Sequence, residues 1–342
     1  MNQTNKIIQL DKNENALGCS YLVHNSIKQS LKIHQYPNSR PLNLIDKISQ
    51  RNGVSPDQVM FGNGSDELLF MIARYYSSPT SEIIIPHSSF EGFDFAAKLA
   101  GAKVVKSPLN NFKINLSQIS QRITDKTSII FLANPNNPTG SFIAIEEIEA
   151  WLAELPKNII VVIDEAYIEY AILDSSNHIC RITDLLNNVI FTRTFSKIYG
   201  LAALRIGYCI AGETVIKNIE QYRAPYNTNT VSQIAASTAI DDFEHIKTSF
   251  LHAEQEKKFI YECVEQLRGE YVESKTNFVL IRFLTNMETL YKFLSAKGIF
   301  TKFFVDEHGV GFLRVTIGKH DELVMLFSLV KEFLIDVKGV NR

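Results

Sequence analysis

The feature that most constrains the fold is an alternation of short β-branched runs with helical patterns between residues 58 and 192. The runs with the composition of strands are Gln58–Phe61, Glu82–Ile85, Ser128–Ala133, Asn158–Ile163 and Val189–Thr192. Helical patterns between them cover Asp66–Tyr76, Gly92–Gly101 and Ile145–Glu154. Strands that are apolar on both faces and separated by helices predict a mostly parallel, doubly wound sheet of the α/β class.

The last third of the chain has a different pattern. The sequence contains no proline after Pro225, and this shift in composition suggests a domain boundary nearby. Beyond it the periodicity predicts a long helix over Ile246–Leu267 and a last helix over Asp321–Val337, with strands around Asn277–Arg282 and Phe312–Ile317. We therefore expect a smaller α+β domain to follow the large one.

Composition excludes several classes of partner. The 342 residues include 35 Lys and Arg against 37 Asp and Glu, so no basic excess favours nucleic acid. The first sixteen residues lack the apolar core of a signal peptide, and no apolar run reaches the roughly 18 residues of a membrane helix. We expect a cytoplasmic protein with a small-molecule partner. The cysteines are far apart and predict reduced thiols without a metal site; they are Cys19, Cys180, Cys209 and Cys263.

Four unusual segments follow predicted strands, and ligands of open α/β sheets bind at the carboxyl ends of strands. The first, FGNGSDELL, places Gly64 and Ser65 at a helix start, where free backbone N–H groups suit a phosphate. An ordinary turn with Ser65 as N-cap is the alternative. The second, Ala133–Gly140, has two Asn-Pro steps that would aim the Asn137 amide at a ligand oxygen, unless it is a plain loop.

The third and fourth segments add charge. In NIIVVIDEAY, Asp164 ends an apolar strand and requires a partner, such as a cation, a metal or a protonated heterocycle, unless it only caps a helix. Tyr167 could face the same ligand. The fourth segment, Thr192–Tyr208, gathers Lys197 and Arg205 with nearby hydroxyls. A solvated basic turn fits it poorly, because apolar residues surround the charges. A phosphate cradle, a carboxylate, ring-oxygen donors and a reactive lysine together match pyridoxal 5′-phosphate.

In these segments the chain resembles the class II, fold-type I pyridoxal-phosphate aminotransferases, and among them the histidinol-phosphate aminotransferases. The motifs that carry the resemblance run in family order from residue 10 to residue 318: LDKNENALG, QYPNSRPLNL, GNGSDELL, NPNNPTG, DEAY, TFSKIYGLAALRIGY and FLRVTIG. The resemblance implies an aspartate aminotransferase-like fold with an amino-terminal arm and part of the small domain in residues 1–30. The large cofactor-binding domain would span residues 31–240, and the small domain residues 241–342.

The resemblance also implies roles for single residues. Lys197 would hold the cofactor covalently and act as catalytic base, Asp164 would pair with the ring nitrogen, and Tyr167 and Asn137 would bind the ring oxygen. Phe90 would stack on the ring. The phosphate site would use Gly64, Ser65, Asp66, Thr194, Ser196 and Arg205. The substrate-binding residues would be Arg314, Lys302 and Asn15. The family often has a cis peptide bond at the position of Asn137–Pro138.

The implied reaction is a ping-pong transfer of an amino group between L-histidinol phosphate and 2-oxoglutarate, as part of histidine biosynthesis. Tyr36 falls where the family reaches into the partner subunit's site, which implies a homodimer with shared active sites. Lys302 departs from the family, which usually has a second arginine there. An aromatic amino-acid aminotransferase and a threonine-phosphate decarboxylase are the alternatives, and a cofactor-binding regulator without catalysis is the least favoured.

Overall fold

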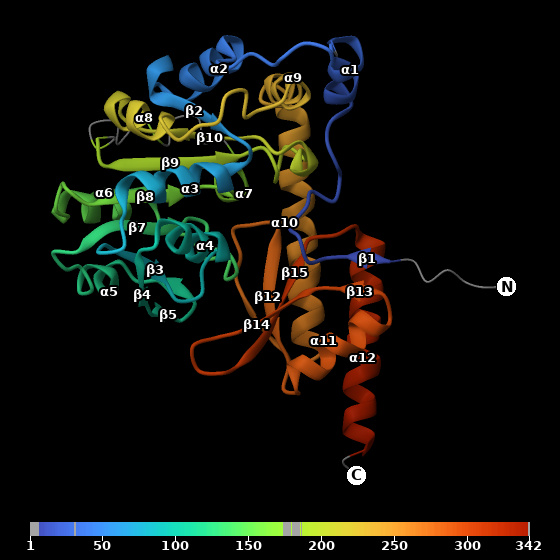
Figure 1. Ribbon diagram of the computed structural model, residues 1–342. Helices are drawn as coiled ribbons and strands as arrows, with labels where there is room; N and C mark the ends of the chain where they lie inside the picture. Colours follow the sequence, from blue (N-terminus) through green and yellow to red (C-terminus); the bar gives the residue numbers. More distant parts are fainter. Residues whose placement is uncertain (1–6, 31, 174–178, 180–184, 186, 341–342) are drawn as a thin grey trace.

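A computed structural model describes residues 7–30, 32–173, 179, 185 and 187–340 (Figure 1). Its central sheet has seven strands in the order β2-β10-β9-β8-β7-β3-β4. The strands are β2 (Val59–Gly62), β3 (Glu82–Pro86), β4 (Lys103–Ser107), β7 (Thr127–Ala133), β8 (Ile160–Asp164), β9 (Val189–Thr194) and β10 (Gly207–Ile210). Every pairing from β4 to β9 is parallel, and only β10 runs antiparallel to its neighbours. The predicted α/β class is confirmed.

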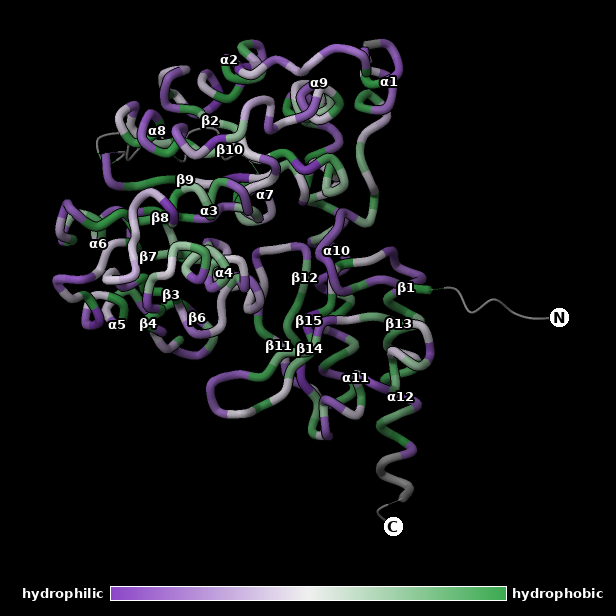
Figure 2. The backbone as a smooth tube through the Cα atoms, viewed as in Figure 1, coloured by the Kyte–Doolittle hydropathy of each residue, from purple (hydrophilic) through white to green (hydrophobic). Residues whose placement is uncertain are grey.

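Helices cover both faces of this sheet, because its strands are apolar on both sides. Ile83 and Ile85 pack into one core cluster, with the helices α3, α4 and α8, whereas Ile84 packs into the other, with α2, α6 and α9. These helices are α2 (Leu42–Asn52), α3 (Ser65–Tyr76), α4 (Glu91–Ala100), α6 (Ile145–Glu154), α8 (Glu213–Glu220) and α9 (Thr230–Ala239). In Figure 2 the strands are predominantly hydrophobic, whereas the helices alternate in colour along their turns.

A second, antiparallel sheet of four strands lies below the first in Figure 1, in the order β11-β12-β15-β14. It comprises β11 (Glu270–Val272), β12 (Phe278–Arg282), β14 (Lys302–Val305) and β15 (Gly311–Thr316). Its helices are α10 (Phe243–Gln266), α11 (Met287–Ala296) and α12 (His320–Val340). The side chain of Val337, which the predicted apolar stripe of the last helix includes, lies outside the described residues. The domain boundaries after residues 30 and 240 stay predictions.

The amino-terminal strand joins this lower part. The strand β1 (Ile8–Gln9) pairs in parallel with β13 (Ile299–Phe300), so a segment near the start of the chain lies beside one near its end. The remaining elements are short connections: α1 (Tyr21–Ser30), β5 (Leu109–Asn110), β6 (Lys113–Ile114), α5 (Leu116–Ser120), α7 (Ile168–Ala171) and the 3-10 turns Pro56–Gln58 and Ala202–Leu204.

The strands and helices predicted from periodicity are confirmed, with bounds that differ by at most three residues. Several strands were not predicted, among them β4 at the edge of the large sheet, β11 and β14 of the smaller sheet, and β10. The polar segment Thr192–Tyr208 is divided in the structure into the end of β9, a 3-10 turn and the start of β10. The run Gly207–Ile210 has only four residues and follows a turn that carries charge, so its composition alone does not distinguish it from the turn.

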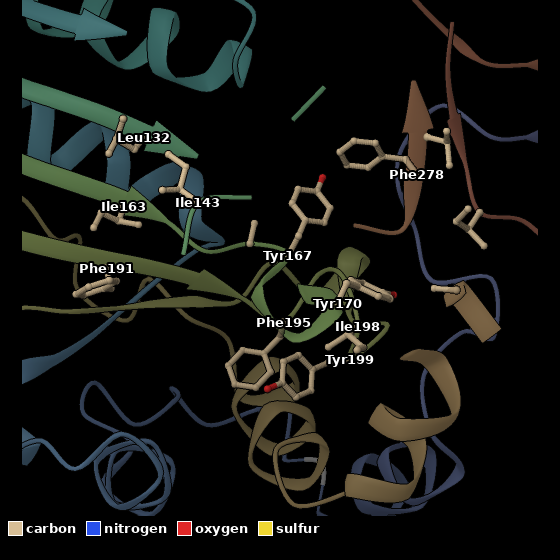
Figure 3. Packing of buried hydrophobic residues seen from close by; sticks show 14 of the residues in the cluster. Leu132, Ile143, Ile163, Tyr167, Tyr170, Phe191, Phe195, Ile198, Tyr199 and Phe278 are labelled. Carbon is tan, nitrogen blue, oxygen red and sulfur yellow. The ribbon is translucent and has the colours of Figure 1, made fainter. Parts of the chain in front are cut away.

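One hydrophobic cluster connects the two sheets. It contains Phe191 of β9, Tyr167 beyond β8 and Phe278 of β12. The rings of Tyr167 and Phe278 lie edge to face with centroids 5.2 Å apart, and Figure 3 shows them facing each other between the strand ends and the smaller sheet. This contact fixes the position of the smaller sheet next to the carboxyl ends of the parallel strands.

Candidate active site

A cavity of about 370 Å³ opens at the carboxyl ends of the parallel strands, within the size range of small-molecule sites. The large sheet, the smaller sheet and the amino-terminal arm all contribute to it. Most of the predicted site residues line it: Ser65, Asp66, Phe90, Asn137, Asp164, Tyr167, Thr194, Ser196, Lys197, Arg205, Lys302 and Arg314. The four polar segments therefore converge on one cavity, as their positions after the strands predict.

Asp164 is the buried acid of the cavity. It is the last residue of β8, is 4% exposed, and its Oδ1 accepts a hydrogen bond of 3.0 Å from the Thr192 hydroxyl of β9. Burial raises the pKa of Asp164 to about 7, and the nearby Asp66 and Glu165 carboxylates add to the rise. A cation placed against this carboxylate would stabilise its charged form. The arrangement therefore favours a ligand with a protonated ring nitrogen.

Lys197 supplies an amine close to that acid. It follows β9, the strand whose Thr192 lies opposite Asp164 in the parallel register. The Nζ donates a 3.2 Å hydrogen bond to the backbone carbonyl of Lys12 and lies 5.6 Å from the centre of the Tyr167 ring. The amine thus faces the cavity. There it can reach an electrophilic carbon of a bound ligand.

An anion cradle lies at the start of α3. The N-cap is Gly64, at φ 79°, and no side chain caps the helix, whose first residues Ser65 and Asp66 line the cavity. The alternative of Ser65 as N-cap is wrong, because Ser65 is the first helical residue. Arg205 Nη1 donates to Ser196 Oγ at 3.3 Å and Nη2 contacts Asp66 at 3.1 Å. Free N–H groups, hydroxyls and a guanidinium in one place suit a phosphate.

The space in this cradle depends on glycine. A Cβ built on Gly64 would lie 2.5 Å from Arg205 Nη2, and a Cβ on Gly207 would lie 2.6 Å from the backbone nitrogen of Ser65. Gly64 does not line the cavity itself. Its contribution is to let the guanidinium approach the helix start. We call the group formed by Asp164, Ser196, Lys197 and Arg205 the strand-end group.

Two amides support the polar side of the cavity. The Tyr167 hydroxyl accepts a 2.9 Å hydrogen bond from Asn13 Nδ2, and Asn137 Oδ1 accepts a 2.5 Å hydrogen bond from Arg314 Nη1. The Asn137 amide nitrogen is thereby turned away from the guanidinium. The expected cis bond at Asn137–Pro138 is confirmed, and Asn134–Pro135 is also cis. A tyrosine hydroxyl and an amide N–H on one side suit a ligand oxygen.

Two cations form the side of the cavity that belongs to the smaller sheet, and we call Lys302 and Arg314 the basic pair. They lie directly opposite each other on β14 and β15. Arg314 is 6% exposed, its guanidinium lies about 5.3 and 5.4 Å from the Phe278 and Phe304 rings, and burial lowers its pKa. Among the described residues its Nε has no hydrogen-bond partner. Lys302 Nζ lies 3.3 Å from a Glu91 oxygen.

Two predicted residues lie away from this cavity. The Asn15 amide donates to the Ile198 carbonyl at 2.7 Å and to Ser249 Oγ at 2.9 Å, and Asn15 is not among the lining residues. Tyr36 is 82% exposed and its ring stacks on that of Tyr226 with centroids 4.8 Å apart. Within one chain Tyr36 does not reach the cavity.

Several lining residues were not named from the sequence. They are Asp11, Lys12, Asn13, Ser89, Glu91, Ala133, Pro135, Ala166 and Phe304. Asn13 lies in the LDKNENALG motif, which was the available signal, but a contact across 154 positions to Tyr167 cannot be read from spacing. Glu91 is adjacent to Phe90 and carried no signal of its own, because a carboxylate in the first turn of a helix is common.

Other features of the chain are simpler. In the described ranges no helix is long and apolar enough to span a bilayer. In those same ranges no three His, Cys, Asp or Glu side chains are grouped as metal ligands would be. Cys19, Cys209 and Cys263 are free thiols, and Cys180 lies outside the described residues.

Comparison with known proteins gives consistent results. The model of the family "Aminotransferase class I and II" matches residues 5–327. A histidinol-phosphate aminotransferase of Caldicellulosiruptor saccharolyticus is 36% identical over 332 residues, which cover 96% of this chain and 92% of that relative. One from Brevibacillus brevis is 34% identical, with coverage of 96% and 91%. The crystal structure of the Sinorhizobium meliloti histidinol-phosphate aminotransferase with pyridoxal-5′-phosphate superposes with a TM-score of 0.92 at 25% identity, covering 97% and 92%.

Proposed function

The chain belongs to the class I and II aminotransferases, and we propose that it transfers an amino group between L-histidinol phosphate and 2-oxoglutarate, with pyridoxal 5′-phosphate as cofactor. The observation that carries the proposal is the convergence of Lys197, Asp164 and the α3 anion cradle on one cavity. Relatives with the name histidinol-phosphate aminotransferase, aligned over nearly the whole chain, support the choice of amino donor. The narrower assignment to class II, the cytoplasmic location and the place in histidine biosynthesis stay part of the proposal.

The residues present fit the cofactor. The glycine at position 64 lets the Arg205 guanidinium approach the start of α3, which suits a phosphate, and the buried Asp164, whose pKa burial raises to about 7, suits a ring nitrogen that carries a proton. When bound, the cofactor supplies an electron-accepting ring and an aldehyde that forms an imine with an amine. Lys197, Tyr167 and Asn137 are placed to hold its reactive side, and Phe90 lines the cavity where a ring can stack.

The protein's own residues then have distinct tasks. Lys197 Nζ would provide covalent attachment and, once free, would take the proton from the substrate's α-carbon and donate it to the cofactor's imine carbon. The Asp164 carboxylate keeps a proton on the ring nitrogen by its charge. The Tyr167 hydroxyl, oriented by Asn13, holds the ring oxygen. Arg314 and Lys302, which both line the cavity, bind the acidic group of the substrate. Asn15 contributes indirectly, by tying the arm to the loop of Lys197.

We also propose that two chains form a homodimer with shared active sites, because Tyr36 is exposed and lies outside its own cavity. A mixture of Tyr36→Ala and Lys197→Ala chains tests this. In mixed dimers one site would keep both residues, so activity above that of either variant alone supports sharing. Activity that stays at the level of the separate variants contradicts it.

A competition assay tests the choice of substrate. Histidinol phosphate and an aromatic amino acid are offered as amino donors with 2-oxoglutarate, and carbon dioxide is measured with threonine phosphate. We expect amino transfer from histidinol phosphate to dominate. Preferred transfer from the aromatic amino acid, or release of carbon dioxide, would replace the proposed reaction with one of the alternatives. Protein that stays colourless after addition of the cofactor would contradict every reading that depends on pyridoxal phosphate.

A further inference from the structure

The basic pair places two like charges next to each other. Lys302 and Arg314 are directly opposite in the antiparallel register of β14 and β15, and both line the cavity. Like charges at such positions repel each other unless an anion lies between them. Arg314 cannot relieve this repulsion by turning to solvent, because it is 6% exposed and held between two aromatic rings. The site therefore needs negative charge whenever it holds no acidic substrate.

Glu91 supplies such a charge from the opposite wall. It is the first residue of α4, on the large sheet, and its carboxylate lies 3.3 Å from Lys302 Nζ. The Glu91 carboxylate also acts on Arg314, since Tyr167, Glu91 and Asp11 all raise the pKa of the guanidinium against the lowering effect of burial. The Glu91 side chain is 72% exposed and that of Lys302 is 43% exposed, so this ion pair can open without unpacking the core. Exposed ion pairs of this kind are weak and easily replaced.

A ping-pong enzyme binds two substrates in one pocket in turn, and their side chains can differ in charge. We propose that Glu91 is a specificity-determining residue that acts as a replaceable counter-ion of Lys302. With an acidic substrate, the distal anion of the substrate pairs with the Lys302 ammonium, and the Glu91 carboxylate moves to solvent. With an uncharged side chain, the Glu91–Lys302 pair stays closed and keeps the basic pair compensated. The residue thereby widens the range of side chains that the pocket accepts. This inference depends on the proposed function.

The test compares the holoenzyme with its Glu91→Gln variant. The acceptors are 2-oxoglutarate, whose side chain is acidic, and phenylpyruvate, whose side chain is uncharged. We expect the KM for 2-oxoglutarate to fall about 1.4- to 5-fold in the variant, the range that an exposed ion pair contributes. The KM for phenylpyruvate should stay equal or rise. Salt should raise the KM for 2-oxoglutarate more in the variant than in the wild type, because Lys302 is then uncompensated.

Two further variants serve as controls. Glu288→Gln removes an exposed carboxylate, 2.7 Å from Lys292 on α11 and outside the cavity, and should leave the ratio of the two KM values unchanged. In a Lys302→Met background, Glu91→Gln should lose its effect on that ratio, since the two residues act as a pair.

The outcomes separate the inference from the function on which it rests. The counter-ion role alone is overturned by any of three results in an active Glu91→Gln enzyme. These are an unchanged KM ratio, a rise in the KM for 2-oxoglutarate, and an equal shift of KM for both acceptors. Absence of amino transfer to either acceptor in the wild type overturns the proposed function.

Discussion

The strand-end group and the basic pair face the same cavity but are held in different ways. Asp164 and Ser196 are buried at the ends of parallel strands, where Asp164 accepts a hydrogen bond from Thr192 and the Ser196 N–H donates to Thr194 Oγ1. In the basic pair Arg314 is buried as firmly, whereas the Lys302 side chain is 43% exposed, the same fraction as that of Arg205 in the strand-end group. The comparison teaches that the buried acid is preorganised for the cofactor, and that each side of the cavity also holds one cation in a partly exposed ion pair that can adapt.

The largest effect is expected at Lys197. Lys197→Ala removes both the attachment point and the proton-transferring amine, and turnover should fall by about 10³-fold or more. The variant should also lose the cofactor that borohydride fixes covalently to the wild-type chain, as mass spectrometry would detect. Cofactor still fixed in the variant would assign the attachment to another lysine and remove Lys197 from the strand-end group.

Asp164 comes next. Removing one partner of a buried charge pair costs about 3–5 kcal/mol, so Asp164→Ala should slow turnover by about two to four powers of ten if the whole cost falls on the transition state. Steady-state kinetics with saturating cofactor measures it. A near-normal rate would contradict the role of the Asp164 carboxylate in turnover.

The same residue makes a prediction about pH for protein stripped of its cofactor. Burial raises the pKa of Asp164 to about 7 from an ordinary value of 3.8, so the folded state binds more protons than the unfolded state between these values. The free energy of unfolding should therefore fall as pH rises from about 4 to about 7, by up to roughly 4 kcal/mol at 1.36 kcal/mol per pKa unit. Urea unfolding of wild type and Asp164→Asn at several pH values tests it, and curves that run parallel would contradict the buried-acid argument.

The smallest effects should separate the two members of the basic pair. Arg314→Met removes a buried cation that makes charge-assisted hydrogen bonds, so kcat/KM for an acidic substrate should fall about 10- to 100-fold. Lys302→Met should cost no more than about fivefold, because an exposed ion pair contributes little. Lys292→Met, on the surface of α11, is the control. Equal losses of kcat/KM at both positions would contradict the argument that the exposed cation contributes less than the buried one.

Local patterns predicted the strand-end group well. The turns after β2, β7, β8 and β9 each combine an apolar strand with a polar segment, and strand ends of a parallel sheet must meet. Asp164 and Lys197 therefore required no knowledge of distant contacts. Local patterns did not predict β10. Its four residues form a strand because they pair with β2 on one side and with β9 on the other.

The remainder of the cavity depends on contacts that no local pattern contains. Asp11, Lys12 and Asn13 present a carbonyl to Arg314, a carbonyl to Lys197 and an amide to Tyr167, respectively. These contacts link positions between 154 and 303 residues apart. Backbone carbonyls also carry no residue-type signal, so even a correct assignment of the arm would not have identified them.

The pairing of β1 with β13 has a consequence for how the enzyme comes into being. The strand Ile8–Gln9 is made before the large sheet, whereas its partner Ile299–Phe300 is made nearly three hundred residues later. Until then the arm that carries Asn13 can contact Tyr167 and the loop of Lys197 but lacks its strand partner, and the parallel sheet can fold around an open cavity. During synthesis, completion of the site is thus tied to the last part of the chain, so a nascent polypeptide that stops short would have a folded sheet without a closed active site.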